Sequence, residues 1–187
     1  IVAANAAVKL VKLLQIAAGV VYSETGVTEL DASERLEALE TLCAGTESKC
    51  IVYVPFKHAQ EMVARHLSKR WRVDVVNGDT SDSKRREIFK DFQTAPEPRV
   101  LVAHPRTTSH GLTLTAADLT VWYAPIFMAE TFEQANNRMN RPGQTKNMTV
   151  ATIAATAMEL EVYRTLEEQG NMQQCLLALY NELDKNV

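Results

Sequence analysis

Two arginines three residues apart mark the stretch QANNRMNRPGQ, residues 134–144, which contains no acidic residue to pair with either of them. On a helix, successive residues turn by about 100°, so Gln134, Arg138 and Arg141 would lie within about 60° of one another. That face would present two planar, permanently charged donors of the kind that clamp phosphate oxygens. The spacing therefore indicates a phosphate-binding helix face.

The opposite face of this helix is apolar. Phe132, Ala135 and Met139 would lie there and pack on a sheet, and Pro142 and Gly143 would end the helix. A simpler alternative is that both guanidiniums pair with distant surface carboxylates. For two arginines at this spacing alone, that alternative is favoured.

Motifs of a self-contained active site are absent from the sequence. It has no GxxxxGK[ST] P-loop, GxGxxG, GxSxG or HExxH. The four histidines are not spaced as metal ligands, so no metal site is expected. The three cysteines are scattered, which is typical of a reduced intracellular protein rather than of a disulfide framework.

Length and composition indicate one globular domain with a sizeable core, since 46% of the 187 residues are hydrophobic and 23% are charged. The net charge of −3 argues mildly against a nucleic-acid partner, but residues 57–72 contain five Lys or Arg and one Glu. A local basic patch is what phosphate binding requires, although a solvated mixed surface explains it equally well. No apolar run approaches 18 residues, so we expect a cytoplasmic protein with no membrane contact. The chain begins at Ile1, which suggests a piece of a longer protein.

Hydrophobic periodicity predicts short apolar strands alternating with helices. The expected strands are residues 50–54, 71–76, 99–104, 119–124 and 147–154. The expected helices are residues 5–18, 31–44, 57–70, 128–140, the segment after a turn within 77–93, and the chain from residue 157 onward. This alternation predicts βαβ units and a parallel sheet covered on both faces, which binds ligands beyond the carboxyl ends of its strands.

The opening stretch resembles the last motif of the superfamily 2 helicases in its Swi/Snf-like form, Q-A-x-x-R-x-x-R-x-G-Q, at six positions. GLTLTAADLTVWYAP (111–125) is similar to the preceding motif of that family. NGDTSDSKR (77–85) resembles its G-x-T-S-x-x-x-R segment, and KCIVYVPFKHAQEMVARHL resembles the strand and helix that open the second lobe. The resemblance covers about residues 47–165 and is nearest to small Swi/Snf-like helicases of bacteriophages.

The resemblance implies an α/β fold: a RecA-like three-layer sandwich with a mainly parallel sheet, of P-loop NTPase type but lacking its own P-loop. Residues 47–156 would form the C-terminal lobe, with a helical extension at 1–46 and further helices at 157–187. It implies the second motor lobe of an ATP-dependent DNA helicase or translocase. ATP and Mg²⁺ would be bound mainly by an N-terminal lobe of the same parent chain, so the isolated fragment would be inactive.

Roles at the nucleotide follow from the same resemblance. Arg141 would be the arginine finger that stabilises the transferring γ-phosphoryl group, and Arg138 would be its companion. Gln134 would orient the helix. Gly111 would let the backbone approach the nucleotide closely, with His110 beside it at the cofactor.

Contacts to DNA phosphates are implied for side chains on the loops of the lobe, which would fix position without reading sequence. Ser81 could equally be a helix cap. The implied contact residues are Lys57, Thr80, Ser81, Arg85 and Thr107.

Departures from the family pattern leave other functions open. Thr108 and Ser109 stand where the family usually has two glycines, just before His110, and Asn137 and Asn140 replace a small residue and a histidine. The glutamine-ended motif and the TAAD strand entry favour a DNA translocase over an RNA helicase lobe. The altered glycines and the acidic outer helices allow a degenerate RecA-like module that only binds a partner.

Overall fold

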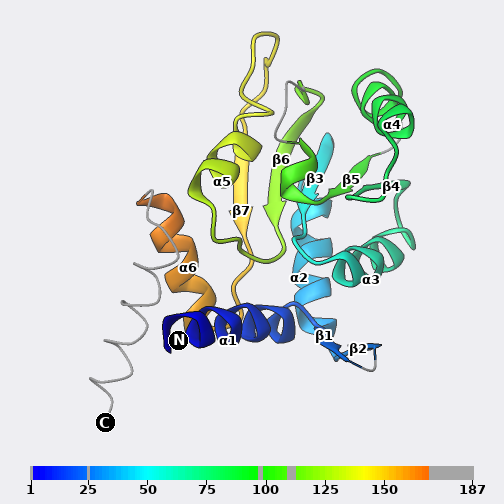
Figure 1. Ribbon diagram of the computed structural model, residues 1–187. Helices are drawn as coiled ribbons and strands as arrows, with labels where there is room; N and C mark the ends of the chain where they lie inside the picture. Colours follow the sequence, from blue (N-terminus) through cyan, green and yellow to red (C-terminus); the bar gives the residue numbers. More distant parts are fainter. Residues whose placement is uncertain (1, 25, 97–98, 109–112, 169–187) are drawn as a thin grey trace.

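A five-stranded parallel sheet forms the middle of the molecule, in the order β4-β5-β3-β6-β7 (Figure 1). The computed structural model describes residues 2–24, 26–96, 99–108 and 113–168. In chain order its elements are α1 (Val2–Ala17), β1 (Val20–Ser23), β2 (Gly26–Glu29), α2 (Ser33–Ala44), β3 (Lys49–Tyr53), α3 (Lys57–Leu67), β4 (Val73–Val76), α4 (Asp82–Thr94), β5 (Val100–Ala103), the 3-10 turn η1 (Pro105–Thr108), β6 (Ala117–Trp122), α5 (Ala129–Asn136), β7 (Thr149–Thr152) and α6 (Ala157–Glu167).

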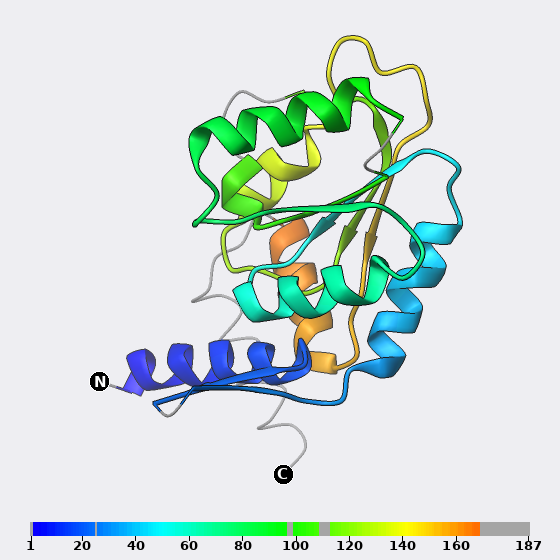
Figure 2. The ribbon, with the colours of Figure 1, turned by 90° about the vertical axis from the view of Figure 1, so that its right-hand side faces the viewer.

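Helices cover both faces of this sheet. Figure 2 shows α2 on one side of the strands and α4 and α5 on the other. Because side chains of a strand alternate between faces, Ile51 and Tyr53 of β3 join the cluster under α4, α5 and α6, and Cys50 and Val52 join the cluster under α2 and α3. Burial on both faces explains the continuous apolar runs of the central strands β3 and β5. The predicted parallel sheet is confirmed.

The segment between α1 and α2 differs from the helical extension that the sequence predicts. Residues 20–23 and 26–29 form an antiparallel hairpin, β1 paired with β2. Gly19 ends α1 with φ +84, and a Cβ there would lie 2.7 Å from the Cβ of Ala32. Only glycine fits this turn, so the helix stops and the β-branched residues that follow continue as a strand.

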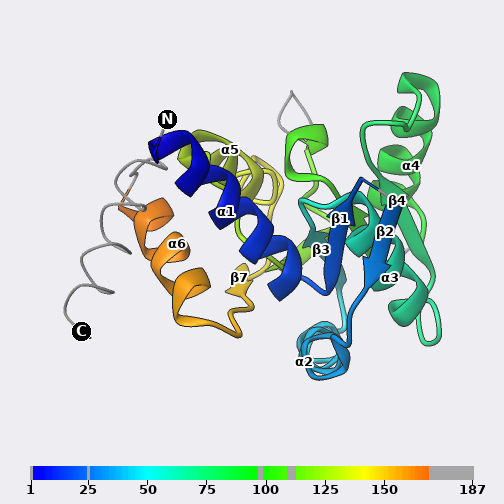
Figure 3. The same cartoon turned by 60° about the horizontal axis from the view of Figure 1, so that its bottom comes forward.

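Helix α1 lies across the carboxyl edge of the sheet, between α6 and the hairpin (Figure 3). A pocket of about 310 Å³ separates it from the loops that follow β3, β5 and β6, with Leu14, Phe56, His104 and Phe127 in its lining. Part of the edge predicted to hold ligands is therefore occupied by this helix. Among the described residues, the structure has no helix long and apolar enough to cross a membrane.

Arg35, on α2, joins the ends of several elements. Its guanidinium donates to the carbonyls of Tyr123 (Nε, 2.9 Å), Ile153 (Nη2, 2.9 Å) and Ala17 (Nη1, 3.1 Å). It also pairs with Glu159 of α6 at 2.6 Å, and both side chains are buried. Arg35 and Glu159 together form a buried hub. This hub fastens α1, α2 and α6 to the carboxyl ends of β6 and β7.

Candidate functional site

Helix α5 ends earlier than the sequence predicts. It is held by Phe132 and Ala135, which are buried as expected, and stops at Asn136. The next residues form tight turns, in which the amide of Arg138 donates to the carbonyl of Ala135 at 3.2 Å and the amide of Arg141 to that of Met139 at 3.0 Å. The expectation that Pro142–Gly143 end the helix is wrong, and so is the single helix face shared by Gln134 and both arginines.

Tertiary partners of the backbone explain the early end. The carbonyl of Arg138 accepts from the amide of Leu114 at 3.0 Å, and the buried Met139 packs under Thr120 of β6. The side-chain amide of Gln144 donates to the carbonyls of Ala117 (2.9 Å) and Thr115 (3.3 Å). These bonds replace the helical ones and fix residues 137–144, the arginine turn, to the amino end of β6.

The two arginines of this turn have different environments. Arg138 is only 4% exposed, whereas Arg141 is exposed and its side chain makes no hydrogen bond or ion pair with any residue that the structure describes. Burial lowers the pKa of Arg138 from its ordinary value, and the neighbouring charge of Arg141 lowers it further. Because the two like charges repel, an anion beside them would be stabilised by both.

Of the three predicted cofactor residues, the structure describes only Gln134. Gln134 is half-buried, and its side-chain amide donates to Glu130 on the same helix at 2.8 Å. Gly111 and His110 lie outside the described residues. The structure therefore does not test the prediction that the backbone at Gly111 closely approaches the nucleotide.

Lys57 begins α3, directly after β3, and lies at the carboxyl edge of the sheet. Its ammonium pairs with Asp79 in the loop after β4 at 2.5 Å, and both side chains are exposed. The hydrogen bond to Asp79 raises the pKa of Lys57 above its ordinary value. Asp79 was not predicted from the sequence, although an acidic residue among the predicted phosphate contacts was a visible signal.

The loop after β4 is held by short-range bonds. Ser81 caps α4 by accepting from the amide of Lys84 at 3.3 Å, which confirms the capping alternative. Arg85 donates to the carbonyl of Thr80 at 3.1 Å and pairs with Asp82 at 3.4 Å. The phosphate contacts of Thr80, Ser81 and Arg85 stay predictions.

Thr107 lies in η1, directly after β5. Its hydroxyl lies 2.7 Å from the carbonyl of His104 and 3.4 Å from that of Val76, the last residue of β4. The structure thus brings Lys57, Thr80 and Thr107 to one edge of the sheet, whereas the arginine turn is bonded to the amino end of β6. Among the described residues, no group of three or more His, Cys, Asp or Glu could hold a metal ion.

The sequence of the chain is similar to those of known proteins. The model of the helicase conserved C-terminal domain matches residues 34–143. The chromatin-remodeling ATPase INO80 of Candida glabrata is 24% identical over 162 residues, 86% of this chain and 11% of that protein. INO80 of Mus musculus is 26% identical over 151 residues, 78% of this chain and 10% of that protein. The chain thus spans about a tenth of these relatives, and a bacteriophage type finds no support.

Solved structures show the same fold. The C-terminal part of the Fun30 ATPase domain has a TM-score of 0.67 and 17% identity, over 84% of this chain and 57% of that one. The Sulfolobus solfataricus SWI2/SNF2 ATPase core in complex with dsDNA has a TM-score of 0.64 and 21% identity, over 84% and 34%. The C-terminal domain of the DEAD-box protein Dbp5 has a TM-score of 0.62 and 17% identity, over 74% and 79%. These likenesses confirm the RecA-like fold. Since the family match covers more than half of it, the chain belongs to the helicase conserved C-terminal domain family.

Proposed function

We propose that the chain is the second motor lobe of an ATP-dependent DNA translocase or helicase. The observation that carries this proposal is the arginine turn, where exposed Arg141 stands beside buried Arg138 on backbone fixed to β6. A protein of similar fold was solved with dsDNA, and the relatives are named ATPases. The chain spans only about a tenth of those relatives. We therefore propose that another part of the parent protein supplies the lobe that would hold ATP.

The chemistry of the proposal is the neutralisation of charge on a phosphoryl group in transfer. Arg141 would reach the γ-phosphate of ATP held by the first lobe, and Arg138 would support it from its buried position. The guanidinium pair fits the phosphates because its own repulsion falls when an anion binds. Mg²⁺, when bound with ATP, neutralises phosphate charge. An arginine finger can supply roughly 10³–10⁵ in rate.

The boundaries of the motor lobe are also proposed. Residues 47–156 would form the lobe, with 1–46 and 157–187 as additions. The hydrophobic clusters support packing of the first addition on the lobe, since Val20 and Leu39 are buried among residues of β3 and β6. The family match begins at residue 34, within α2.

The isolated chain is expected to show no DNA-stimulated ATP hydrolysis, because the sequence offers fingers without a phosphate-binding P-loop. The measurement is phosphate release by purified residues 1–187, with and without duplex DNA, compared with the full-length parent protein. Robust turnover by residues 1–187 would refute the assignment as a second lobe. A parent protein without DNA-stimulated turnover would indicate a partner-binding module.

Changes at the Lys57–Asp79 pair are expected to alter DNA affinity in opposite directions. Lys57→Ala would weaken binding by the parent protein and reduce the slope of log affinity against log salt by about 0.9, the value for one lost phosphate contact. Asp79→Asn would free the ammonium and raise affinity roughly two- to fivefold, as for other exposed pairs. Fluorescence anisotropy on labelled duplex DNA measures both.

The matched control for this pair is Glu37→Gln, because Glu37 is an exposed acid on α2 and its loss changes net charge equally. An Asp79→Asn effect no larger than that of Glu37→Gln would contradict a specific contact at Lys57. Binding to RNA that is tighter than to duplex DNA would favour an RNA helicase lobe.

A further inference from the structure

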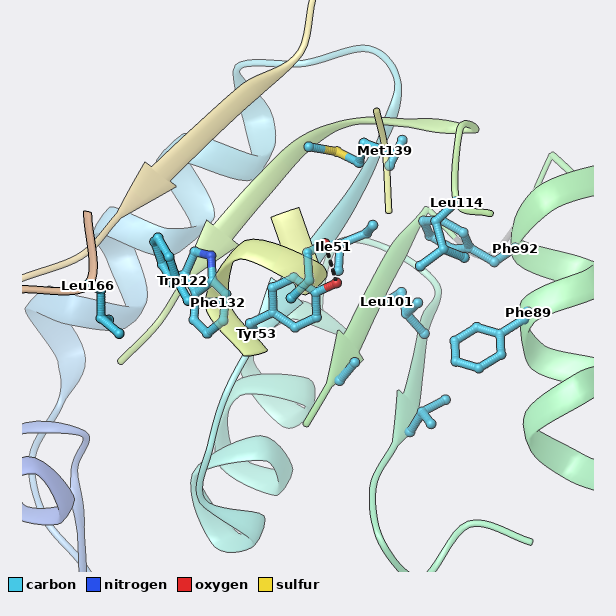
Figure 4. Packing of buried hydrophobic residues seen from close by; sticks show 14 of the residues in the cluster. Ile51, Tyr53, Phe89, Phe92, Leu101, Leu114, Trp122, Phe132, Met139 and Leu166 are labelled. Atoms are coloured by element: carbon cyan, nitrogen blue, oxygen red, sulfur yellow. Dashed lines mark hydrogen bonds between the residues drawn. The ribbon is translucent and has the colours of Figure 1, made fainter. Parts of the chain in front are cut away.

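Two buried hydroxyl groups form a chain between the turn after β5 and the end of α5. The hydroxyl of Thr108 in η1 lies 3.2 Å from that of Tyr53 on β3, and the Tyr53 hydroxyl donates to the carbonyl of Ala135 at 3.2 Å. Both side chains have no exposed surface. Figure 4 shows Tyr53 within the core, with a dashed line leaving its hydroxyl. This series of hydrogen bonds therefore runs through the protein interior, where water does not compete for the bonds.

The direction of these bonds follows from the groups involved. A carbonyl can only accept, so an unbroken connection requires that Tyr53 gives its proton to Ala135 and accepts from Thr108. Burial raises the pKa of Tyr53 to about 12, so this proton stays in place at neutral pH. The single proton of Thr108 has a second acceptor, the carbonyl of Pro105 at 3.0 Å. The Thr108–Tyr53 bond can thus break without leaving a buried donor unsatisfied.

The two ends of this series of hydrogen bonds lie at different parts of the candidate site. Thr107, next to Thr108, is bonded to Val76 at the edge with the predicted DNA contacts. At the other end, the carbonyl of Ala135 also accepts from the amide of Arg138, the first arginine of the arginine turn. A shift of η1 on DNA would therefore reach the backbone of that turn through two hydroxyl groups.

We propose that Thr108 and Tyr53 are positioning residues that couple DNA contact at η1 to the placement of the arginine turn. This inference rests on the proposed motor function. A glycine at the position of Thr108, as in the pattern that the opening stretch resembles, would have no hydroxyl to make this connection. The coupling is thus a property of this chain's own residues, and it acts by moving Arg138 and Arg141 rather than by touching nucleotide.

The test uses the full-length parent protein. Thr108→Val keeps the shape of the side chain and removes the hydroxyl, and it is expected to lower maximal DNA-stimulated ATP turnover about tenfold, as a small misplacement of catalytic groups does. The DNA concentration for half-maximal stimulation should change less than about twofold, because no DNA contact is removed. Thr108→Ser, which retains the hydroxyl, should restore turnover. Tyr53→Phe should match Thr108→Val, and the double variant should be no worse than either, because both break one chain.

Matched controls separate coupling from loss of stability. Tyr163→Phe removes another buried hydroxyl, which donates to the carbonyl of Trp122 at 3.2 Å, and Thr165→Val removes one bonded within α6. Both controls should retain turnover. The coupling is refuted if Thr108→Val keeps wild-type turnover, if Thr108→Ser fails to restore it, or if the controls lose as much. A wild-type parent without DNA-stimulated ATPase would overturn the motor function and the coupling together, whereas normal turnover in all variants overturns the coupling alone.

Discussion

Arg141→Ala in the full-length parent protein is expected to lower DNA-stimulated ATP turnover by about 10³-fold or more. The side chain is exposed, lies next to a second guanidinium and makes no hydrogen bond or ion pair with any other residue in the described ranges. Its removal should therefore cost little stability while removing a charge that acts on the transferring phosphoryl group. Steady-state phosphate release at saturating ATP and DNA measures the effect.

Two further variants sharpen the result for Arg141. Arg141→Lys keeps the charge but loses the planar fork of donors, so most of the rate should still be lost. Arg72→Ala removes an exposed arginine before β4 and should leave turnover within about twofold of wild type. Turnover of Arg141→Ala within threefold of wild type would show that another residue neutralises the phosphoryl charge.

Glu159→Ala is expected to lower the free energy of unfolding of the chain by about 3–5 kcal/mol. The change leaves the guanidinium of Arg35 buried with no carboxylate, and it also removes the acceptor for the amide of Ala155 at 2.9 Å. Since Arg35 bonds carbonyls from three other elements, it cannot turn toward solvent without releasing them. Urea unfolding followed by tryptophan fluorescence measures the loss.

The matched control for Glu159 lies two residues further along α6. Glu161 pairs with Arg164, whose side chain is 62% exposed, so Glu161→Ala should cost at most about 1 kcal/mol from the pair. Replacing both buried partners, as Arg35→Met with Glu159→Leu, should be less destabilising than Glu159→Ala alone. A loss for Glu159→Ala no larger than that for Glu161→Ala would contradict the role given to the hub.

The sheet could be predicted from the sequence because burial on both faces leaves a continuous apolar run. CIVYV and RVLVAH show this run, and β3 and β5 lie within or next to the predicted ranges. The hairpin of β1 and β2 could not be predicted, because Gly19 acts through its contact with Ala32, a residue that lies beside it only in the fold. Its local signals were Gly26 and the β-branched residues around it.

The arginine turn shows a second limit of sequence reasoning. Periodicity extended α5 to residue 140, because Met139 has helical spacing from Phe132 and Ala135. The bonds that end the helix come from Leu114 and Gln144, whose partners are set by the position of β6. Motif spacing selects the two arginines as candidates, but it could not predict that one side chain is buried and the other exposed.

The most direct test of the proposed role of Arg141 at the nucleotide compares two ligands of the parent protein, ADP with aluminium fluoride and ADP alone. Aluminium fluoride with ADP mimics the phosphoryl group in transfer, and an arginine finger acts on that state more than on the ground state. In Arg141→Ala, affinity for ADP with aluminium fluoride is expected to fall at least about 100-fold, while affinity for ADP changes less than about threefold. Equal weakening of both ligands, or of neither, would contradict the claim that this chain contributes Arg141 to a nucleotide held by another lobe.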